Sequence, residues 1–127
     1  MPKGSDAMKF EVLGEPIPLA RARFGRGRAY LPKRSREYRC RLAEAAVEAL
    51  SGHEPLTGEL SCRIEIYRKY KRTARTYGDV DNHIKAALDG MQGIIFADDK
   101  QVVEISAVKH TDKARPRLVV EVNQLSP

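Results

Sequence analysis

The chain has 127 residues and a mass of 14.3 kDa, a length that predicts one domain with a modest core. Its composition argues against a membrane protein, because 31% of residues are charged and no apolar run approaches the ~20 residues of a span. Lysine and arginine number 23 against 17 acids, so the net charge is +6, an excess compatible with a polyanionic partner.

The N-terminus and the cysteines bear on the domain boundaries and on the cellular compartment of the protein. Residues 1–7 are expected to be a flexible leader or a tag remnant, and residues 8–125 a single domain. The N-terminus lacks the apolar stretch of a signal peptide. Cys40 and Cys62 are the only cysteines and lack zinc-ligand spacing, which favours two free thiols in a reducing cytosol.

The first half of the chain is predicted to hold a strand, a basic irregular segment and a helix. Residues 8–14 alternate apolar and polar side chains, as a strand does. Residues 20–34 are irregular and very basic, with a short strand expected at 28–31. Apolar residues then recur at helical spacing from an N-cap at Ser35 to the pair Ser51–Gly52.

A strand, a loop and the best-defined helix follow. Residues 59–70 alternate again and predict a strand, and the basic stretch 71–78 predicts a loop. Asp81 can cap the next helix, and Gly93 ends it. The predicted apolar face of this helix consists of Ile84, Leu88 and Met91.

Two more strands complete the predicted fold. Residues 101–110 and 115–123 both alternate, a pattern typical of antiparallel pairs with one wet face. The predicted order is therefore β-(β)-α-β-α-β-β. It corresponds to an α+β fold in which two helices pack on a mixed sheet.

The positive charge is concentrated in two segments. Residues 21–41 include nine basic residues and one acid, and residues 63–75 include six basic residues and one acid. Arginine holds phosphate oxygens in a bidentate manner, so two such segments favour a nucleic-acid backbone over a merely solvated face. The expected DNA-binding residues are Arg21, Arg23, Arg26, Arg28, Lys69, Lys71, Arg72 and Arg75. Five tyrosines among these charges could either stack on bases or pack: Tyr30, Tyr38, Tyr67, Tyr70 and Tyr77.

Against this positive background, acids gather between residues 79 and 99. Asp79 and Asp81 point the same way in an extended approach to the helix, because side chains alternate with a period of two. Asp98 and Asp99 return just before the strand at 101–110. Carboxylates converging from these places would form a hard oxygen site suited to Mg²⁺ or Mn²⁺.

Each acid also has a structural interpretation. Asp81 alone would cap a helix, Asp79 would be a surface acid, and Asp98–Asp99 would form a turn before a strand. The Asp-x-Asp-Asn spacing is shared with EF-hand loops, but Ile84 stands where such a loop needs glycine. His83, the histidine nearest these acids, is more typical of packing or of a surface than of a metal ligand.

The order of these residues resembles that of a known family. Asp-Val-Asp-Asn-x-x-Lys-x-x-x-Asp at 79–89 and Asp-Asp-Lys-Gln-Val-Val at 98–103 are similar to the RusA family of Holliday-junction resolvases. Upstream, Pro-x-Pro-x-x-Arg-x-Arg at 16–23, then Tyr30-x-Pro32 and Tyr38, are also similar. The resemblance covers roughly residues 8–123, and it departs at His83, where an apolar residue is more usual.

The resemblance implies a homodimeric, Mg²⁺-dependent endonuclease, often prophage-encoded, that cuts four-way DNA junctions symmetrically in recombination and repair. It implies metal ligands at Asp79, Asp81 and Asp99 and a catalytic lysine at Lys85, with Mn²⁺ as a possible substitute ion. Residues that match positions with a supporting role are Asn82, Asp89 and Asp98. Such an enzyme is expected in the cytoplasm, associated with the nucleoid.

Three alternatives compete with this interpretation. A non-catalytic nucleic-acid-binding module would use the acids only to cap helices and relieve charge. A metal-dependent phosphoesterase for small molecules would not need the long arginine-rich segments. Lys85 itself could be structural, paired with Asp81 or Asp89 one turn away.

Overall fold

The computed structural model describes residues 7–20, 23–25 and 27–125. Residues 1–6 of the expected leader, together with Arg21 and Arg26, lie outside the described residues. At Arg23 and Arg28 only the backbone is described.

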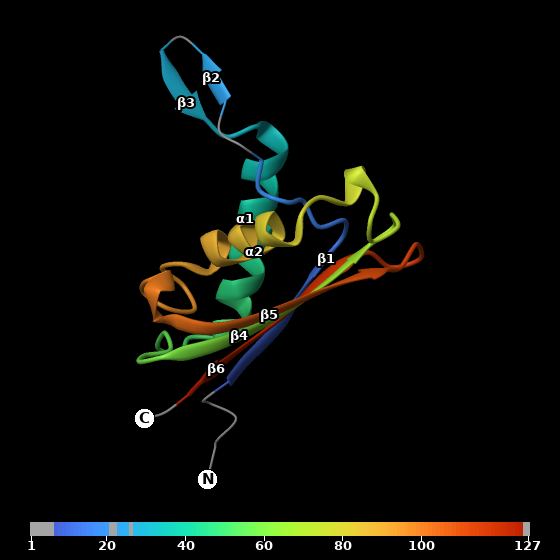
Figure 1. The fold of residues 1–127 in the computed structure, drawn as a ribbon. Coiled ribbons are helices and arrows are strands. Elements are labelled where there is room, and N and C mark those ends of the chain that lie inside the picture. Colours follow the sequence, from blue (N-terminus) through green and yellow to red (C-terminus); the bar gives the residue numbers. More distant parts are fainter. Residues whose placement is uncertain (1–6, 21–22, 26, 126–127) are drawn as a thin grey trace.

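A four-stranded sheet forms one layer of the molecule, and two helices form the other (Figure 1). The strands are β1 (Ala7–Leu13), β4 (Leu60–Arg68), β5 (Val102–Thr111) and β6 (Arg117–Gln124). Their order is β1-β6-β4-β5, in which β6 is antiparallel to both neighbours and β4 runs parallel to β5. The predicted α+β fold with a mixed sheet is confirmed.

The short strand expected near residue 28 belongs to a hairpin, β2 (Arg23–Gly25) and β3 (Arg28–Tyr30). Gly27, with φ of +79°, sits in the turn, because this backbone conformation favours glycine. The hairpin projects from the body of the molecule near the start of α1 (Figure 1). It therefore carries part of the first basic segment away from the core.

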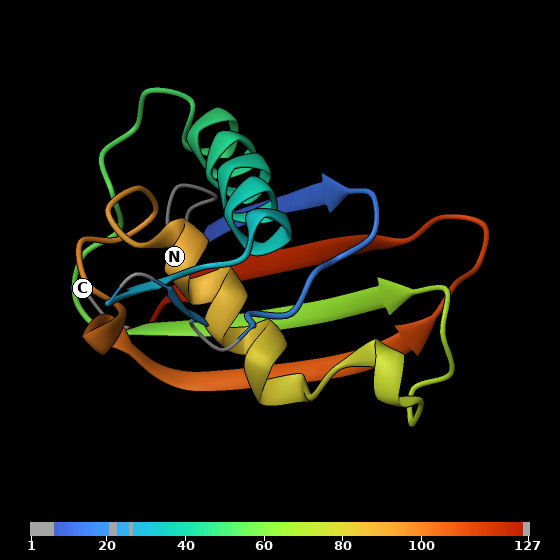
Figure 2. The same ribbon diagram turned by 90° about the horizontal axis from the view of Figure 1, so that it is seen from above.

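Helices α1 (Lys33–Leu50) and α2 (Val80–Met91) cover one face of the sheet (Figure 2). Helix α1 begins two residues before Ser35, because Pro32 occupies the N-cap and its carbonyl accepts from the Arg36 amide at 3.1 Å. Ser35 is buried in the first turn, so its predicted capping role is wrong. None of the helices in the described part of the chain is long and apolar enough to cross a membrane.

The N-cap of α2 is Asp79 rather than the predicted Asp81. Gly78, with φ of +89°, turns the chain before the helix, and a Cβ there would lie 2.7 Å from Pro18 Cγ. The Asp79 carbonyl then accepts from the amides of Asn82 and His83 at 3.1 and 3.2 Å. This turn fixes both aspartates at the exposed start of α2.

The core lies between the helices and the inward positions of the strands. Alternation predicted the inward residues of β4 and β6, such as Ile64 and Val120, which are fully buried. The face of α2 differs from the predicted stripe, because Ile84 and Leu88 are only partly buried. The most buried residues of α2 are His83, Ala86, Ala87, Gly90 and Met91. These are mostly small residues, and they allow α2 to pack closely on α1.

Candidate active site

Asp79 and Asp81 are exposed at the start of α2. Within the described residues neither carboxylate accepts a hydrogen bond or forms an ion pair, and Asp79 does not cap the helix with its side chain. Their oxygens are therefore available to a ligand. Exposed carboxylate oxygens are the donors that Mg²⁺ prefers, so this pair fits part of the predicted metal site.

Asp99 lies near the C-terminal end of α2, away from the helix start that carries Asp79. Its amide donates to Gln92 Oε1 at 3.3 Å, and Gln92 is the C-cap of the helix. A helix of 12 residues is about 18 Å long, so Asp99 is far from Asp79. Among the described residues, no three carboxylate, imidazole or thiol groups lie close enough to hold one ion. One protomer therefore does not bring the three predicted ligands together.

Asp98 stabilises the turn that precedes β5. Its carboxylate accepts from the Lys100 amide at 2.9 Å, and Gln101 Oε1 accepts from the Asp98 amide at 3.1 Å. The two contacts form a capping box at the short 3₁₀ helix η3 (Asp99–Gln101). Gln101 Nε2 also donates to the carbonyls of Leu56 and Gly58. Asp98 thus holds Asp99 in a fixed turn.

Lys85 is exposed one turn after Asp81, and in the described part of the chain it forms no ion pair. The salt bridges considered for it, to Asp81 or to Asp89, are not formed. Asp89 instead accepts from Arg39 Nη1 at 3.0 Å, which joins α2 to α1. The ammonium of Lys85 is therefore free to contact a ligand held at the start of the helix.

A buried polar network lies behind the two aspartates, and sequence reasoning did not find it. By sequence Arg68 belongs to the second basic segment, but its side chain is only 3% exposed and donates to Glu15 and to the carbonyls of Thr76 and Tyr77. The signal was present in the sequence, since Arg68 continues the inward alternation of Leu60 to Ile66. A cation at an inward position of a strand indicates a buried, paired charge.

His83 belongs to the same network. Its Nε2 lies 2.8 Å from the Tyr77 carbonyl, and its side chain is 2% exposed. Because a carbonyl only accepts, Nε2 donates the hydrogen. Burial lowers the pKa of His83 to about 4, so the ring is neutral at neutral pH. Its packing role agrees with the preferred interpretation of an isolated histidine.

The second basic segment leads directly to the aspartates. Exposed cations line the chain between β4 and the 3₁₀ helix η2 (Arg75–Tyr77): Lys69, Lys71, Arg72 and Arg75. The chain here is fastened to β5, because Lys109 Nζ donates to the Arg72 carbonyl at 3.0 Å. This contact fixes the basic segment that leads along the chain to Asp79.

The tyrosines divide between packing and exposure. Tyr38 and Tyr77 are buried, so packing is the correct interpretation for both. Tyr67 is engaged by the Arg117 guanidinium, 3.8 Å from its ring centroid, and by the His110 ring, 4.4 Å away. Tyr30 on β3 is 48% exposed and remains available to a ligand.

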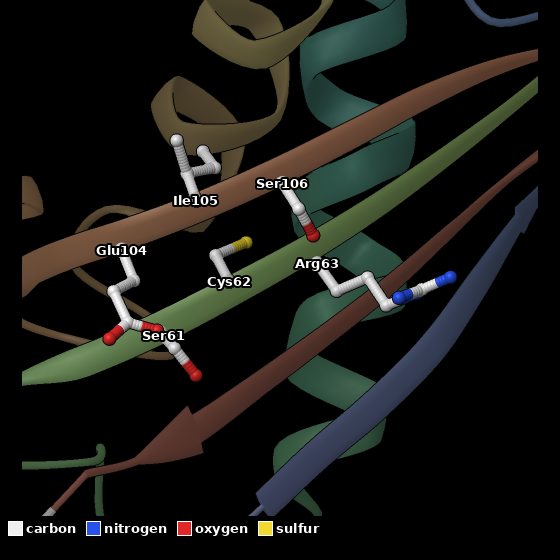
Figure 3. A pocket seen from close by; sticks show the side chains of 6 residues that line it. All are labelled: Ser61, Cys62, Arg63, Glu104, Ile105 and Ser106. Carbon is white, nitrogen blue, oxygen red and sulfur yellow. The ribbon is translucent and has the colours of Figure 1, made fainter.

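Two of the hollows on the surface of the described residues differ in their relation to the predicted site. One of about 280 Å³ adjoins Asp79, and its lining includes Pro18, Arg34, Ser35, Gly78 and Asn82. The other, of about 390 Å³, is shallow and lies over β4 and β5, where Ser61, Arg63 and Glu104 point away from the helices (Figure 3). Of these two, the first has a predicted site residue, Asn82, in its lining, and the second does not.

Comparison with known proteins agrees with these features. The family model of endodeoxyribonuclease RusA matches residues 14–123, which is most of the chain. The uncharacterized protein YqaN of Bacillus subtilis (strain 168) is 30% identical over 145 aligned positions, covering 95% of this chain and 99% of that protein. The chain therefore belongs to the RusA endodeoxyribonuclease family.

Proposed function

We propose that the protein is a Mg²⁺-dependent endonuclease that resolves Holliday junctions and related branched DNA in the cytoplasm, during recombination and repair. The observation that carries this proposal is the start of α2, where Asp79, Asp81 and Lys85 are exposed and have no ion-pair partner among the described residues, after a basic segment of the chain. Family membership gives the reaction class. The geometry adds which groups are free to act.

The residues at this helix start would each have a different role in phosphodiester hydrolysis. Asp79 and Asp81 would hold the ion, and Mn²⁺ could replace it. Bound Mg²⁺ supplies an activated water and a polarised phosphate. Lys85 would contact a non-bridging phosphate oxygen and stabilise negative charge in the transition state. The cations from Lys69 to Arg75 would bind the flanking backbone, largely independently of sequence.

We further propose that the active unit is a homodimer in which Asp99 of each copy completes the site of the other. The proposal is supported by the length of α2, about 18 Å, because Asp79 lies at the start of this helix and Asp99 contacts its C-cap residue Gln92. A twofold dimer would also provide two matched sites for the two strands that junction resolution must cut.

The free edge of β5 is our candidate for the dimer contact. Val103 and Ile105 on this edge strand are 51% and 41% exposed. Asp99 precedes the start of β5, whereas Tyr77, near the start of α2, contacts His110 near its end. Antiparallel pairing of two β5 strands would reverse their directions and bring Asp99 of one copy toward Asp79 of the other.

Cleavage of labelled DNA tests the proposed function. The protein should cut a four-way junction in Mg²⁺ but not in EDTA, and should leave linear duplex largely intact. Asp79→Asn should abolish cleavage and retain or strengthen junction binding, because it removes a negative charge near phosphate. Binding without cleavage by the unmodified protein would instead favour the non-catalytic module. Normal cleavage by Asp79→Asn would refute the assigned site.

A further inference from the structure

We propose that Arg68 is a positioning residue for the Asp79–Asp81 pair. By holding backbone carbonyls of the segment just before Asp79, it would keep the two carboxylates in the arrangement that binds the metal ion, and so set the metal affinity of the pair. This inference rests on the proposed function, because it concerns the same site. Arg68 does not contact the aspartates in this structure. It acts on the backbone two and three residues before Asp79.

The guanidinium of Arg68 donates three hydrogen bonds to three different residues. Nε donates to Glu15 Oε2 at 2.7 Å, and Nη1 donates to the carbonyls of Thr76 and Tyr77 at 3.2 and 2.7 Å. Its carbon Cζ also lies 4.9 Å from the ring centroid of Tyr70. One buried side chain thus joins the end of β4, the segment after β1 and the last turn before α2.

The Tyr77 carbonyl is the point on which this arrangement depends. It accepts from Arg68 Nη1 at 2.7 Å and interacts with His83 Nε2 at 2.8 Å, so both of its acceptor directions are occupied. His83 lies on the first turn of α2, and only Gly78 separates Tyr77 from Asp79. The carbonyl is therefore clamped from the sheet on one side and from the helix on the other.

Gly78 is the reason why such a clamp is needed. A glycine at φ of +89° lacks the side chain that would restrict its rotation. The amides of Asn82 and His83 hold the carbonyl side of Asp79, but its amide side follows Gly78. Without the clamp, rotation at Gly78 would therefore loosen the placement of the Asp79 carboxylate relative to Asp81. Buried hydrogen bonds that orient a metal ligand typically contribute ~10–100-fold to metal affinity or activity.

A lysine cannot replace these contacts. Its single nitrogen cannot face Glu15 and two carbonyls in the planar geometry of a guanidinium. In the Arg68→Lys variant we therefore expect charge and solubility to be retained and the clamp to loosen. The matched control is Arg117→Lys. Arg117 is a partly buried arginine of β6, 3.0 Å from Asp112, and it lies on the face of the sheet opposite the helices.

The test measures Mn²⁺ binding directly, by the EPR signal of the free ion, alongside the Mg²⁺ dependence of junction cleavage. Arg68→Lys should weaken Mn²⁺ binding about tenfold or more and raise the half-saturating Mg²⁺ concentration similarly, with junction affinity in EDTA unchanged. Arg117→Lys should leave both metal readouts unchanged even if it lowers the melting temperature. Unaltered Mn²⁺ affinity in a folded Arg68→Lys protein would overturn the proposal.

If Arg68→Lys does not fold, two variants of the opposite side of the clamp decide the matter. His83→Leu removes a donor to the Tyr77 carbonyl, whereas His83→Gln offers an amide donor in its place. We expect weaker Mn²⁺ binding in the first and recovery in the second, and equal affinities would refute the clamp. Wild-type protein that binds Mn²⁺ no better than Asp79→Asn would instead refute the proposed metal site.

Discussion

Cations near the start of α2 differ in whether they face water or carbonyl groups. Arg68 is buried and donates to Glu15 and two carbonyls, whereas Lys85 is exposed and, among the described residues, unpaired. Composition cannot distinguish the two, because both are cations close to the same acids in sequence. Strand alternation can, since it puts Arg68 on the inward side of β4. The difference predicts opposite consequences of substitution for stability and rate.

For Lys85, the expected consequence concerns rate alone. Lys85→Ala should leave the melting temperature and junction affinity nearly unchanged, because the side chain forms no ion pair in the described structure. The single-turnover cleavage rate should fall ~10²–10³-fold, the usual effect of removing one preorganised charge donor. Lys85→Arg provides a control for charge. Near-normal cleavage by Lys85→Ala would show that Lys85 is a solvated surface cation without a catalytic role.

The elements of the fold were largely predictable, because each strand and helix carries its own periodicity. Alternation identified β1, β4, β5 and β6, and helical spacing identified α1 and α2. The position of Asp99 relative to Asp79 was not predictable in this way. The two residues are 20 positions apart in the sequence, an interval that a loop could bring together in space. The 12-residue helix between them instead keeps them at opposite ends of α2.

The β2–β3 hairpin provides a prediction at the scale of an element. It includes Arg23 and Arg28 of the first basic segment and projects from the body, so under the proposed function we expect it to contact DNA backbone (Figure 1). Neutralising Arg21, Arg23 and Arg26 together should weaken junction binding. It should also flatten the salt dependence by about 0.9 in log K per decade of salt for each phosphate that the variant no longer neutralises.

The matched comparison for the hairpin is neutralisation of Lys71 and Arg72, in the segment before α2. Because that segment is attached to β5 and leads along the chain to Asp79, removing its charges should reduce cleavage more strongly than the hairpin variant does, when the two variants are compared at equal occupancy of the junction. A salt slope that is unchanged in the hairpin variant, measured by fluorescence anisotropy between about 50 mM and 200 mM salt, would assign DNA affinity elsewhere.

At the scale of the whole molecule, the split between Asp79 and Asp99 leads to a test by mixing. Asp79→Asn and Asp99→Asn homodimers should each be inactive if the site is shared between copies. A heterodimer of the two would contain one intact site and one doubly altered site. Co-expression should therefore restore nicking of one junction strand, with about half of the dimers being mixed by random assembly.

The control is co-expression of Asp79→Asn with Asp81→Asn. Both of these substitutions fall on the same copy's share of a site, so every dimer of this mixture has two damaged sites and should stay inactive. Restored cleavage in the control would show that the assay is contaminated. Failure of the first mixture, with wild-type protein active, would place all metal ligands within one chain.

The order of strands in the sheet has a consequence for how the protein is made. β6, the last strand along the chain, lies in the middle and pairs with both β1 and β4. During synthesis, β1 and β4 therefore leave the ribosome before the strand that joins them exists. β4 and β5 can associate early through α2, but β1 must wait with an unpaired edge. We expect the nascent chain to need β6 outside the exit tunnel before the sheet closes, which makes its emergence the committed step of folding.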